Sequence, residues 1–469
     1  MSSTPTRPTV FRLAALLIGA VLLAGSHAVA KEALADLFEA RVRSVVAVEF
    51  FVETEIDRRP SVVVGVPIDR EGTVVLLDSS VPGWLPPAQL KDFKIYLPRS
   101  VDGVPAEYLG QDQLTGWHFI RASAPFPGEV VPITEYETAR PRIGDPVWGI
   151  AVMGKDFDFQ PYLMEANVAL LQKVPQEVGF CVREVASPGG PVFSADGAFL
   201  GWAGNPIWQE RDIYLEGVRY NASIRNPNGS GSFLLAHEFL PWLKRIPESV
   251  TGQAVPWLGI IGMQPVEREA AKFLKIENVS AILVSDIIEG SPAAEAGMQK
   301  RDIILTIDGE PLPRFSPQRV VSSYFEREIL RRKPGDRMRL GILRGTDERL
   351  EVEVTLGQQP TPLKEARRTW FERLGFTVRE IVLYDKIQRQ LLESGETGVI
   401  ANFVKPNTPA NTAGLMAGDL IREIDGVEIT DYDQAVEILR GIEEDPTRNE
   451  FVLLISRGTE TSVIRVRLQ

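Results

Sequence analysis

Few side chains in this sequence could act as a nucleophile or a general base. Its 469 residues include one cysteine, Cys181, and three histidines, His27, His118 and His237. Covalent hydrolysis needs a hydroxyl or thiol beside a base, which is usually histidine. Cys181 with His118 is the one cysteine–histidine dyad that the composition permits. His118 stands between Trp and Phe on a predicted strand, so a packed structural histidine is the favoured interpretation, as is a buried thiol for Cys181.

Other candidate groups are weaker. Ser187 precedes a Pro-Gly-Gly turn, and His237 lies in a predicted helix whose polar neighbours indicate a solvated surface. Asp156 and Asp158 flank one phenylalanine in a predicted loop but lack the further oxygens of a calcium loop. No phosphate-binding, dinucleotide-binding or HExxH motif occurs. The sequence therefore predicts no metal site and no cofactor.

Composition and charge narrow the class further. Acidic residues number 63 against 51 Lys and Arg, giving a net charge of -12, which argues against a nucleic-acid-binding face. The length suggests about three domains. A single cysteine excludes an internal disulfide.

The N-terminus has the pattern of a secretory signal peptide. Arg7 and Arg12 precede an uncharged apolar run over residues 13–25, and Ala28-Val29-Ala30 places small residues where a signal peptidase reads. We expect cleavage after Ala30 and a periplasmic location. An uncleaved anchor and an organelle transit peptide are the alternatives.

The C-terminal half contains an internal repeat. Residues 289–309 read EGSPAAEAGMQKRDIILTIDG, and residues 406–426 read PNTPANTAGLMAGDLIREIDG. An apolar-Gly-apolar step precedes each copy, Leu258-Gly259-Ile260 in the first and Leu374-Gly375-Phe376 in the second. Each copy predicts a strand (282–288 or 399–404), a one-turn helix from Pro to Gly, and a strand ending in an Asp-Gly turn. In the second copy, residues 432–442 have the spacing of an amphipathic helix.

Residues 31–250 predict a different architecture. Many short apolar runs separated by Gly, Pro and Asp are typical of an antiparallel barrel or sandwich. Helices are expected at 33–41 and 234–244. Aromatic residues in or near predicted loops could line a binding surface or cap the core: Trp84, Trp202, Trp208, Tyr214 and Tyr220. The expected strands are 45–51, 61–66, 73–77, 93–97, 118–122, 147–152, 167–171 and 199–203.

The repeated module resembles a PDZ domain of bacterial exported proteases. In such domains the apolar-Gly-apolar step is a carboxylate-binding loop, where a glycine lets backbone N–H groups converge on a peptide C-terminus. The resemblance implies an edge strand at 261–263 and at 377–379, to which an extended peptide adds. A structural module with a blocked groove is the alternative for either copy. The implied peptide-binding residues are Leu258, Gly259, Ile260, Ile261, Leu374, Gly375, Phe376 and Thr377.

The whole layout resembles the HtrA/Deg serine proteases. Residues 34–48, the Gly144-Asp145-Pro146-Val147 turn and the Pro188-Gly189-Gly190-Pro191 loop follow that family's landmarks. The implied fold is mainly β, a degenerate trypsin-like double β-barrel followed by two PDZ domains. The expected divisions are a signal peptide (1–30), a protease-like domain (31–250), PDZ domains at 255–357 and 367–469, and a linker at 358–366.

The catalytic triad of that family is replaced at all three positions. The resemblance places Pro188 at the nucleophile, Gly116 at the aspartate, and Ser79 or Ser80 at the histidine. Loss of the nucleophile alone costs about six powers of ten in a related mechanism. The sequence thus predicts an exported pseudoprotease that binds C-terminal or extended peptide segments of unfolded envelope proteins, as a chaperone, adaptor or decoy. An endopeptidase using unrecognised residues and a scaffold in mixed oligomers with an active Deg protease are the alternatives. The resemblance also makes a homotrimer conceivable.

Overall fold

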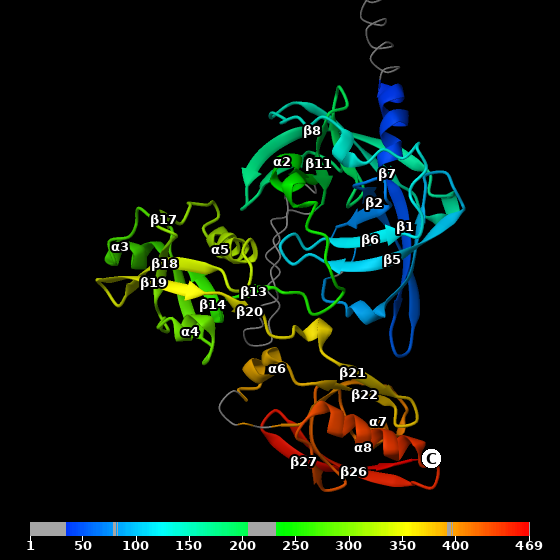
Figure 1. The fold of residues 1–469 in the computed structure, drawn as a ribbon, viewed down its shortest axis with the longest axis vertical. Coiled ribbons are helices and arrows are strands. Elements are labelled where there is room, and N and C mark those ends of the chain that lie inside the picture. The colour runs from blue at the N-terminus through cyan, green and yellow to red at the C-terminus, as the bar shows by residue number, and fades with distance from the viewer. Residues whose placement is uncertain are drawn as a thin grey trace, which may run out of the picture.

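The computed structural model describes residues 34–77, 81, 83–204, 231–391, 395 and 397–468. The predicted signal peptide, Ser79, Ser80, Trp208, Tyr214 and Tyr220 lie outside the described residues. The described chain forms a double barrel followed by two smaller modules, one for each copy of the repeat (Figure 1). None of its described helices is both long and apolar enough to span a membrane.

The first barrel is closed in the order β1-β2-β3-β6-β5-β4, with antiparallel neighbours. A helix over residues 34–41 precedes it, as expected. Strand β5 is absent from the predicted strands because its Gly, Pro and Glu residues break the apolar alternation. The strands are β1 (Val46–Glu53), β2 (Arg58–Pro67), β3 (Thr73–Leu76), β4 (Leu90–Tyr96), β5 (Gly103–Gln111) and β6 (His118–Ala122).

The second barrel is closed in the order β10-β11-β12-β9-β8-β7. The helix expected at 234–244 is wrong at its start, because residues 234 and 235 belong to β12, and it is broken by Pro241, which lacks an N–H. Only α2 (Ala236–Phe239) and a 3-10 turn at Leu240–Trp242 remain. The strands are β7 (Pro146–Val152), β8 (Pro161–Lys173), β9 (Glu177–Cys181), β10 (Pro191–Ser194), β11 (Phe199–Ala203) and β12 (Ser232–Leu235).

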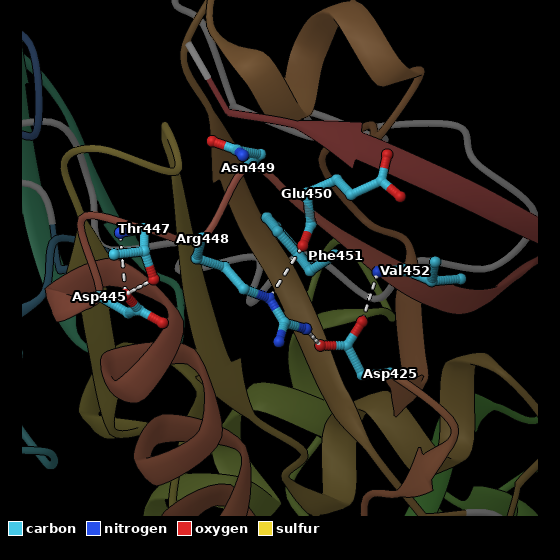
Figure 2. A pocket seen from close by; sticks show the side chains of 8 residues that line it. All are labelled: Asp425, Asp445, Thr447, Arg448, Asn449, Glu450, Phe451 and Val452. Atoms are coloured by element: carbon cyan, nitrogen blue, oxygen red, sulfur yellow. Dashed lines mark hydrogen bonds and ion pairs between the residues drawn. The ribbon is translucent and has the colours of Figure 1, made fainter.

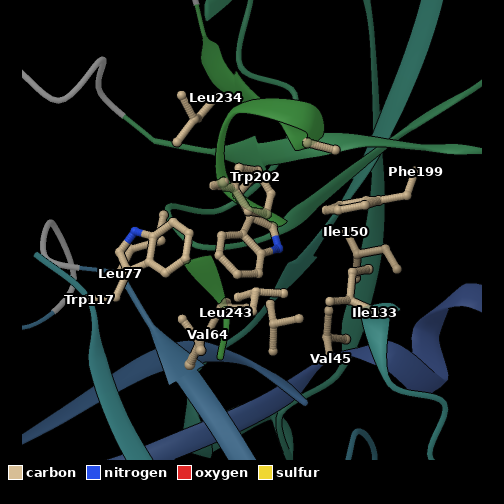
Figure 3. Packing of buried hydrophobic residues seen from close by; sticks show 14 of the residues in the cluster. Val45, Val64, Leu77, Trp117, Ile133, Ile150, Phe199, Trp202, Leu234 and Leu243 are labelled. Carbon is tan, nitrogen blue, oxygen red and sulfur yellow. The ribbon is translucent and has the colours of Figure 1, made fainter. Parts of the chain in front are cut away.

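A buried aromatic cluster joins the two barrels. Trp117, on the loop before β6, lies with its ring 4.7 Å from that of Trp202 on β11 and 5.3 Å from that of Phe239 on α2. Aliphatic side chains from both barrels, such as Val64 and Ile150, pack around these rings (Figure 3). Trp202 is therefore a core residue, one of the two roles that its sequence left open, whereas Trp84 is 71% exposed.

The first repeat module is an antiparallel sheet in the order β14-β15-β16-β18-β19, with β17 paired to β16 and β13 paired to β20. Its strands are β13 (Pro256–Trp257), β14 (Ile260–Pro265), β15 (Ile282–Ile287), β16 (Ile303–Ile307), β17 (Glu310–Pro311), β18 (Arg337–Arg344), β19 (Glu348–Thr355) and β20 (Gly357–Gln358). Its helices are α3 (Arg268–Phe273), α4 (Pro292–Glu295) and α5 (Val320–Leu330).

The second module has the order β21-β22-β23-β24-β26-β27, with β25 paired to β24. Its N-terminal strand differs from that of the first module, since β21 pairs with the next strand in sequence. The strands are β21 (Arg368–Phe371), β22 (Phe376–Glu380), β23 (Val399–Val404), β24 (Leu420–Ile424), β25 (Val427–Glu428), β26 (Glu450–Arg457) and β27 (Glu460–Arg467). The helices are α6 (Leu383–Gln388), α7 (Pro409–Ala413) and α8 (Tyr432–Glu444).

The repeated aspartates have structural roles. Asp302 is buried and accepts two hydrogen bonds from Arg344, at 2.9 and 2.8 Å. Its counterpart Asp419 makes the same two-pronged contact with Arg457, at 2.7 Å to each oxygen. In both modules the arginine also donates to the carbonyl of the glycine that follows the one-turn helix. A buried carboxylate needs such a partner, which explains why the pair occurs in both copies.

The barrel interface should dominate the stability of the double barrel. Trp202→Ala removes a fully buried indole, so we expect about 3–5 kcal/mol of lost unfolding free energy. Trp84→Ala is the matched control, and because that side chain is mostly exposed its effect should stay within about 0.5 kcal/mol. Urea denaturation followed by circular dichroism measures both, and equal losses would contradict the assigned core.

Candidate functional site

The landmarks of the predicted triad fall on three loops of the double barrel: β3–β4, β5–β6 and β9–β10. The serines at the histidine position, Ser79 and Ser80, are outside the described residues. Gly116 lies on the β5–β6 loop with a φ of +75°. Its N–H donates to the Asp112 carbonyl at 2.8 Å, and its own carbonyl accepts from the Gln111 amide at 2.8 Å. Gly116 thus shapes the loop and supplies no carboxylate.

The β9–β10 loop places Pro188 on the surface. Proline has neither a hydroxyl nor a backbone N–H, so this position offers neither a nucleophile nor an oxyanion donor. The two following amides are used inside the domain, since Gly189 donates to Ala203 at 2.8 Å and Gly190 donates to Ser187 at 2.7 Å. Pro188 thus keeps the turn and supplies neither a hydroxyl nor an N–H at this position.

His118 is buried on β6, in keeping with the expected structural role. Its Nδ1 is hydrogen-bonded to the Tyr108 hydroxyl at 2.7 Å. Removal from water, with a smaller contribution from Lys364, lowers the pKa of His118 to about 3. The imidazole therefore stays neutral in the folded chain across the physiological range.

Cys181 cannot pair with this histidine in the described structure, because it lies on β9 of the other barrel. It packs among apolar residues such as Val168 and Val192. Burial raises the pKa of its thiol to about 12, which keeps it protonated. The interpretation as a structural thiol agrees with this environment.

His237 is exposed, with 32% of its side chain accessible, in keeping with the expected surface position. Its Nε2 lies 3.0 Å from a Glu177 oxygen and 3.7 Å from a Glu238 oxygen. Glu238 also accepts the backbone N–H of Glu177 at 3.0 Å. The ligand atoms of these three residues lie within 4.8 Å of one another. These contacts tie α2 to β9, which accounts for the cluster.

A hollow of about 460 Å³ lies on the second module at the end of α8 (Figure 2). Its polar lining groups bond to one another. Arg448 pairs with Asp425 and donates from Nε to the Glu450 carbonyl at 2.9 Å. Asp425 in turn accepts the Val452 N–H at 2.8 Å. These contacts hold the Asp-Gly turn of the repeat against β26, so the hollow is structural.

The apolar-Gly-apolar loop of the first module has a fixed orientation. The Leu258 carbonyl accepts the Ala293 N–H at 2.9 Å, and the Gly259 carbonyl accepts the Ile288 N–H at 2.9 Å. In a trans peptide the N–H points opposite to the carbonyl of the same plane. The amides of Gly259 and Ile260 therefore face away from the body of the module. A side chain at Gly259 would clash, since its Cβ would lie 2.1 Å from the Ser291 Cβ.

The strand that follows this loop is at the edge of its sheet, as expected. β14 is the terminal strand in the sheet order and pairs with β15 on its inner side. Helix α5 lies along the other side, where Ser322 donates to the Met263 carbonyl of β14 at 3.3 Å. Gln318, just before α5, donates to the Val266 carbonyl just after β14 at 2.8 Å. One carbonyl of the edge strand is thus held by a side chain that a docking peptide could replace.

The second module repeats the loop but not the free edge. The carbonyls of Leu374 and Gly375 accept from Ala410 at 3.4 Å and from Lys405 at 2.9 Å. However, β22 pairs with β23 on one side and with β21 on the other. The expectation that residues 377–379 form an edge strand is therefore wrong. The reason is that the chain before the loop folds back along β22 as a hairpin.

This hairpin strand and the docking of the modules were missed at the sequence level. Within residues 368–371, RTWF, the last three are β-branched or aromatic, which favours a strand, but four residues are too few to show a period. Helix α5 also docks on the double barrel, where the largely buried Arg327 donates to the Leu114 carbonyl at 3.2 Å. Contacts of this kind between distant segments leave no local pattern.

Comparisons with known proteins agree with this architecture. Models described as PDZ domains match residues 259–356 and 402–451. A protein named "Probable periplasmic serine endoprotease DegP-like" from Chlamydia trachomatis is 28% identical over 237 residues, 49% of this chain and 44% of the relative. One of the same name from Halomonas elongata is 26% identical over 307 residues, 63% of this chain and 59% of the relative. A solved structure titled "HtrA-type protease AlgW with decapeptide" superposes with a TM-score of 0.50 at 16% identity, over 70% of this chain and 99% of that one.

In sequence and in layout the chain is similar to HtrA/DegP-like proteases. Its fold is the trypsin-like double barrel followed by two PDZ domains. The matched region spans about half the length of the first curated relatives. Those relatives are named as proteases, whereas the position implied for the nucleophile holds Pro188 in this chain, which has neither a hydroxyl nor an N–H.

Restoring one group should not restore peptide cleavage in this HtrA/DegP-like chain. We expect Pro188→Ser to remain inactive, because Gly116 still supplies no carboxylate. Hydrolysis of casein and labelling by a fluorophosphonate probe are the measurements. Ser187→Ala and Cys181→Ala serve as controls for unrecognised nucleophiles. Cleavage by the native chain that either control abolishes would contradict a non-catalytic protein.

The buried histidine should make stability fall in acid. His118 has a folded pKa near 3, below the unfolded value of about 6.5, so the unfolded chain binds more protons as the pH drops below 6.5. The contribution of neutral His118 to the free energy of unfolding is therefore fully present above pH 6.5 and is lost progressively between pH 6.5 and 3. We expect roughly 1 kcal/mol less unfolding free energy at pH 5.5 than at pH 7. His118→Gln should remove this part of the loss in urea titrations, and an unchanged slope would refute the assignment.

Proposed function

We propose that this chain is an exported, non-catalytic HtrA/DegP-like protein that binds C-terminal or extended peptide segments of envelope proteins through its PDZ domains. Its role would be that of a chaperone, adaptor or decoy. The periplasmic naming of the relatives and the apolar N-terminal run support the location. The residues implied for peptide binding, Leu258 to Ile261 and Leu374 to Thr377, remain a proposal.

The observation that carries the binding role is the orientation of the loop at Gly259. Two consecutive amides face away from the module because their carbonyls are held by Ala293 and Ile288. Convergent N–H groups at the end of an edge strand suit a C-terminal carboxylate, and the backbone of β14 can pair with the rest of an extended peptide. The first PDZ domain is therefore the favoured site.

The non-catalytic role rests on Pro188, which removes the hydroxyl and the oxyanion amide together. An endopeptidase using other residues would need a base, and the described histidines are poorly placed for it. His118 is buried and neutral, and His237 is paired with two glutamates. A scaffold in mixed oligomers with an active Deg protease, or a homotrimer, would show as co-purification of subunits rather than as peptide binding.

Binding to the first PDZ domain should require a free C-terminus and Gly259. Fluorescein-labelled decapeptide pools with free or amidated C-termini are the probes, and fluorescence polarisation on the full chain is the measurement. Gly259→Ala should weaken binding at least tenfold, because the loop cannot keep its φ of +87° beside Ser291. Gly345→Ala is the matched control, since Gly345 also has a positive φ but faces open space on another turn.

A second variant keeps the test decisive if Gly259→Ala disturbs the domain. Ser322→Ala frees the Met263 carbonyl on β14 without touching the loop, so peptides should bind a few-fold more tightly. Equal affinity for free and amidated pools, together with no effect of Ser322→Ala, would refute peptide capture by this domain.

A further inference from the structure

The second PDZ domain carries its own chain in the place of a peptide. Strand β21 runs antiparallel to β22, with Arg368 opposite Arg379 and Phe371 opposite Phe376. This is the outer edge of β22, because β23 takes the inner edge. Helix α8 lies along the same segment and contacts it through Tyr432 and Asp433. Residues 367–371 therefore fill the space between strand and helix where an extended peptide would add.

The end of this segment meets the carboxylate loop. The Phe371 carbonyl accepts the Gly375 N–H at 2.8 Å, and this amide faces outward because the carbonyls on either side of it are tied down. The Phe371 side chain is 1% exposed and packs in the domain core with Ala435 and Leu439 of α8. A carbonyl on the loop and an apolar side chain in the pocket are the two contacts that a C-terminal residue would make.

The residues two and four positions before Phe371 also contact α8, as alternate side chains of a bound strand would. Thr369, two residues before Phe371 and on the same face, has its hydroxyl 2.7 Å from that of Tyr432 at the start of α8. Arg367 bonds to Glu380 at 2.8 Å and to Asp433 at 2.8 and 3.0 Å, and it lies over the Tyr432 ring. Residues 367–371 therefore contact the first turn of α8, the apolar pocket around Phe371 and the loop at Gly375.

Two further side chains, Arg373 and Thr377, hold this arrangement. Arg373, in the turn between β21 and β22, donates to the carbonyls of Ile442, Glu443 and Asp445 at the C-terminal end of α8, at 2.7 to 3.3 Å. On the outer face, Thr377 donates to Glu55 at 3.0 Å, which lies in the β1–β2 hairpin of the double barrel. The protease-like domain therefore braces the strand against which β21 lies.

We propose that Arg367–Phe371 is an internal ligand that occludes the peptide groove of the second PDZ domain. The proposal rests on the proposed function, in that this groove is taken to be a peptide site. When the segment leaves, the groove accepts peptides with the same chemistry: a hydroxyl residue two positions before a C-terminal aromatic residue. The first domain stays available, since its chain before the loop pairs with β20 instead.

The test loosens the segment without touching Phe371 or the loop. Arg367→Ala with Thr369→Val removes the contacts to α8 and Glu380, in the full chain and in a Gly259→Ala background that silences the first domain. Arg465→Ala is the matched control, because Arg465 is an exposed arginine on β27 of the same domain with one ion pair of 3.8 Å to Glu450. Hydrogen exchange over residues 367–380 reports whether β21 is docked.

The binding probe is fluorescein-labelled Arg-Arg-Thr-Trp-Phe with a free or an amidated C-terminus. We expect slow exchange and weak binding in the unloosened chain and in the control. The loosened variant should exchange faster at β21 and bind the free-acid peptide at least tenfold more tightly, with no gain for the amide. If this variant leaves β21 docked, the single variants Thr369→Pro and Trp370→Pro provide a second route. Of two neighbouring amides in a strand only one faces β22, so one of these two prolines removes an N–H that faces β22.

Three results would overturn the proposal. The first is fast exchange at β22 in the unloosened chain, or peptide binding there as tight as in the loosened variant. The second is a released β21 with no gain in peptide binding. The third is that no variant frees β21 without unfolding the domain, which would make it a structural strand. Binding to the first domain, measured in the chain with Gly259 intact, tests the proposed function separately.

Discussion

One peptide-plane constraint governs both PDZ grooves. The carbonyls of Gly259 and Gly375 accept the amides of Ile288 and Lys405, both at 2.9 Å, so the following N–H groups must face outward. Glycine is required at both positions, because a Cβ would lie 2.1 or 2.2 Å from a Ser291 or Thr408 carbon. The same constraint therefore builds the same donor site twice. What differs is the chain that arrives before the loop, and that difference decides which site is filled.

The packing of the double barrel does not depend on the positions implied for the triad. The aromatic contacts of Trp117, Trp202 and Phe239 depend on volume and burial, and no triad residue takes part in them. The β5–β6 region also has partners outside the double barrel. Arg327 of the first PDZ domain bonds to the β5–β6 loop, and Lys364 of the linker bonds to Gln111 beside it. Burial lowers the pKa of Arg327 to about 10, so its charge persists there at neutral pH.

The sequence was informative where a pattern is local. The strand at 118–122, the strand at 399–404 and the start of α8 at residue 432 follow from alternation and helical spacing, and the structure places them there. The missed strands β10 and β12 have four residues each, too few for a period. The occupation of the groove beside β22 could not be predicted from local sequence. The role of Thr369 depends on its contact with Tyr432, which lies far along the chain.

An internal ligand lowers the apparent affinity of the second groove for an external peptide. A segment joined to the loop by a short turn has an effective concentration of order millimolar, and an external peptide must compete with it. The apparent affinity falls by the fraction of chains in which β21 has left. The external peptide has one advantage, since its carboxylate carries a charge that the Phe371 carbonyl lacks, and charge-assisted bonds to backbone amides are roughly twice as strong. Because Glu55 braces β22 from the double barrel, a movement between these domains would shift that balance without any change in the groove itself.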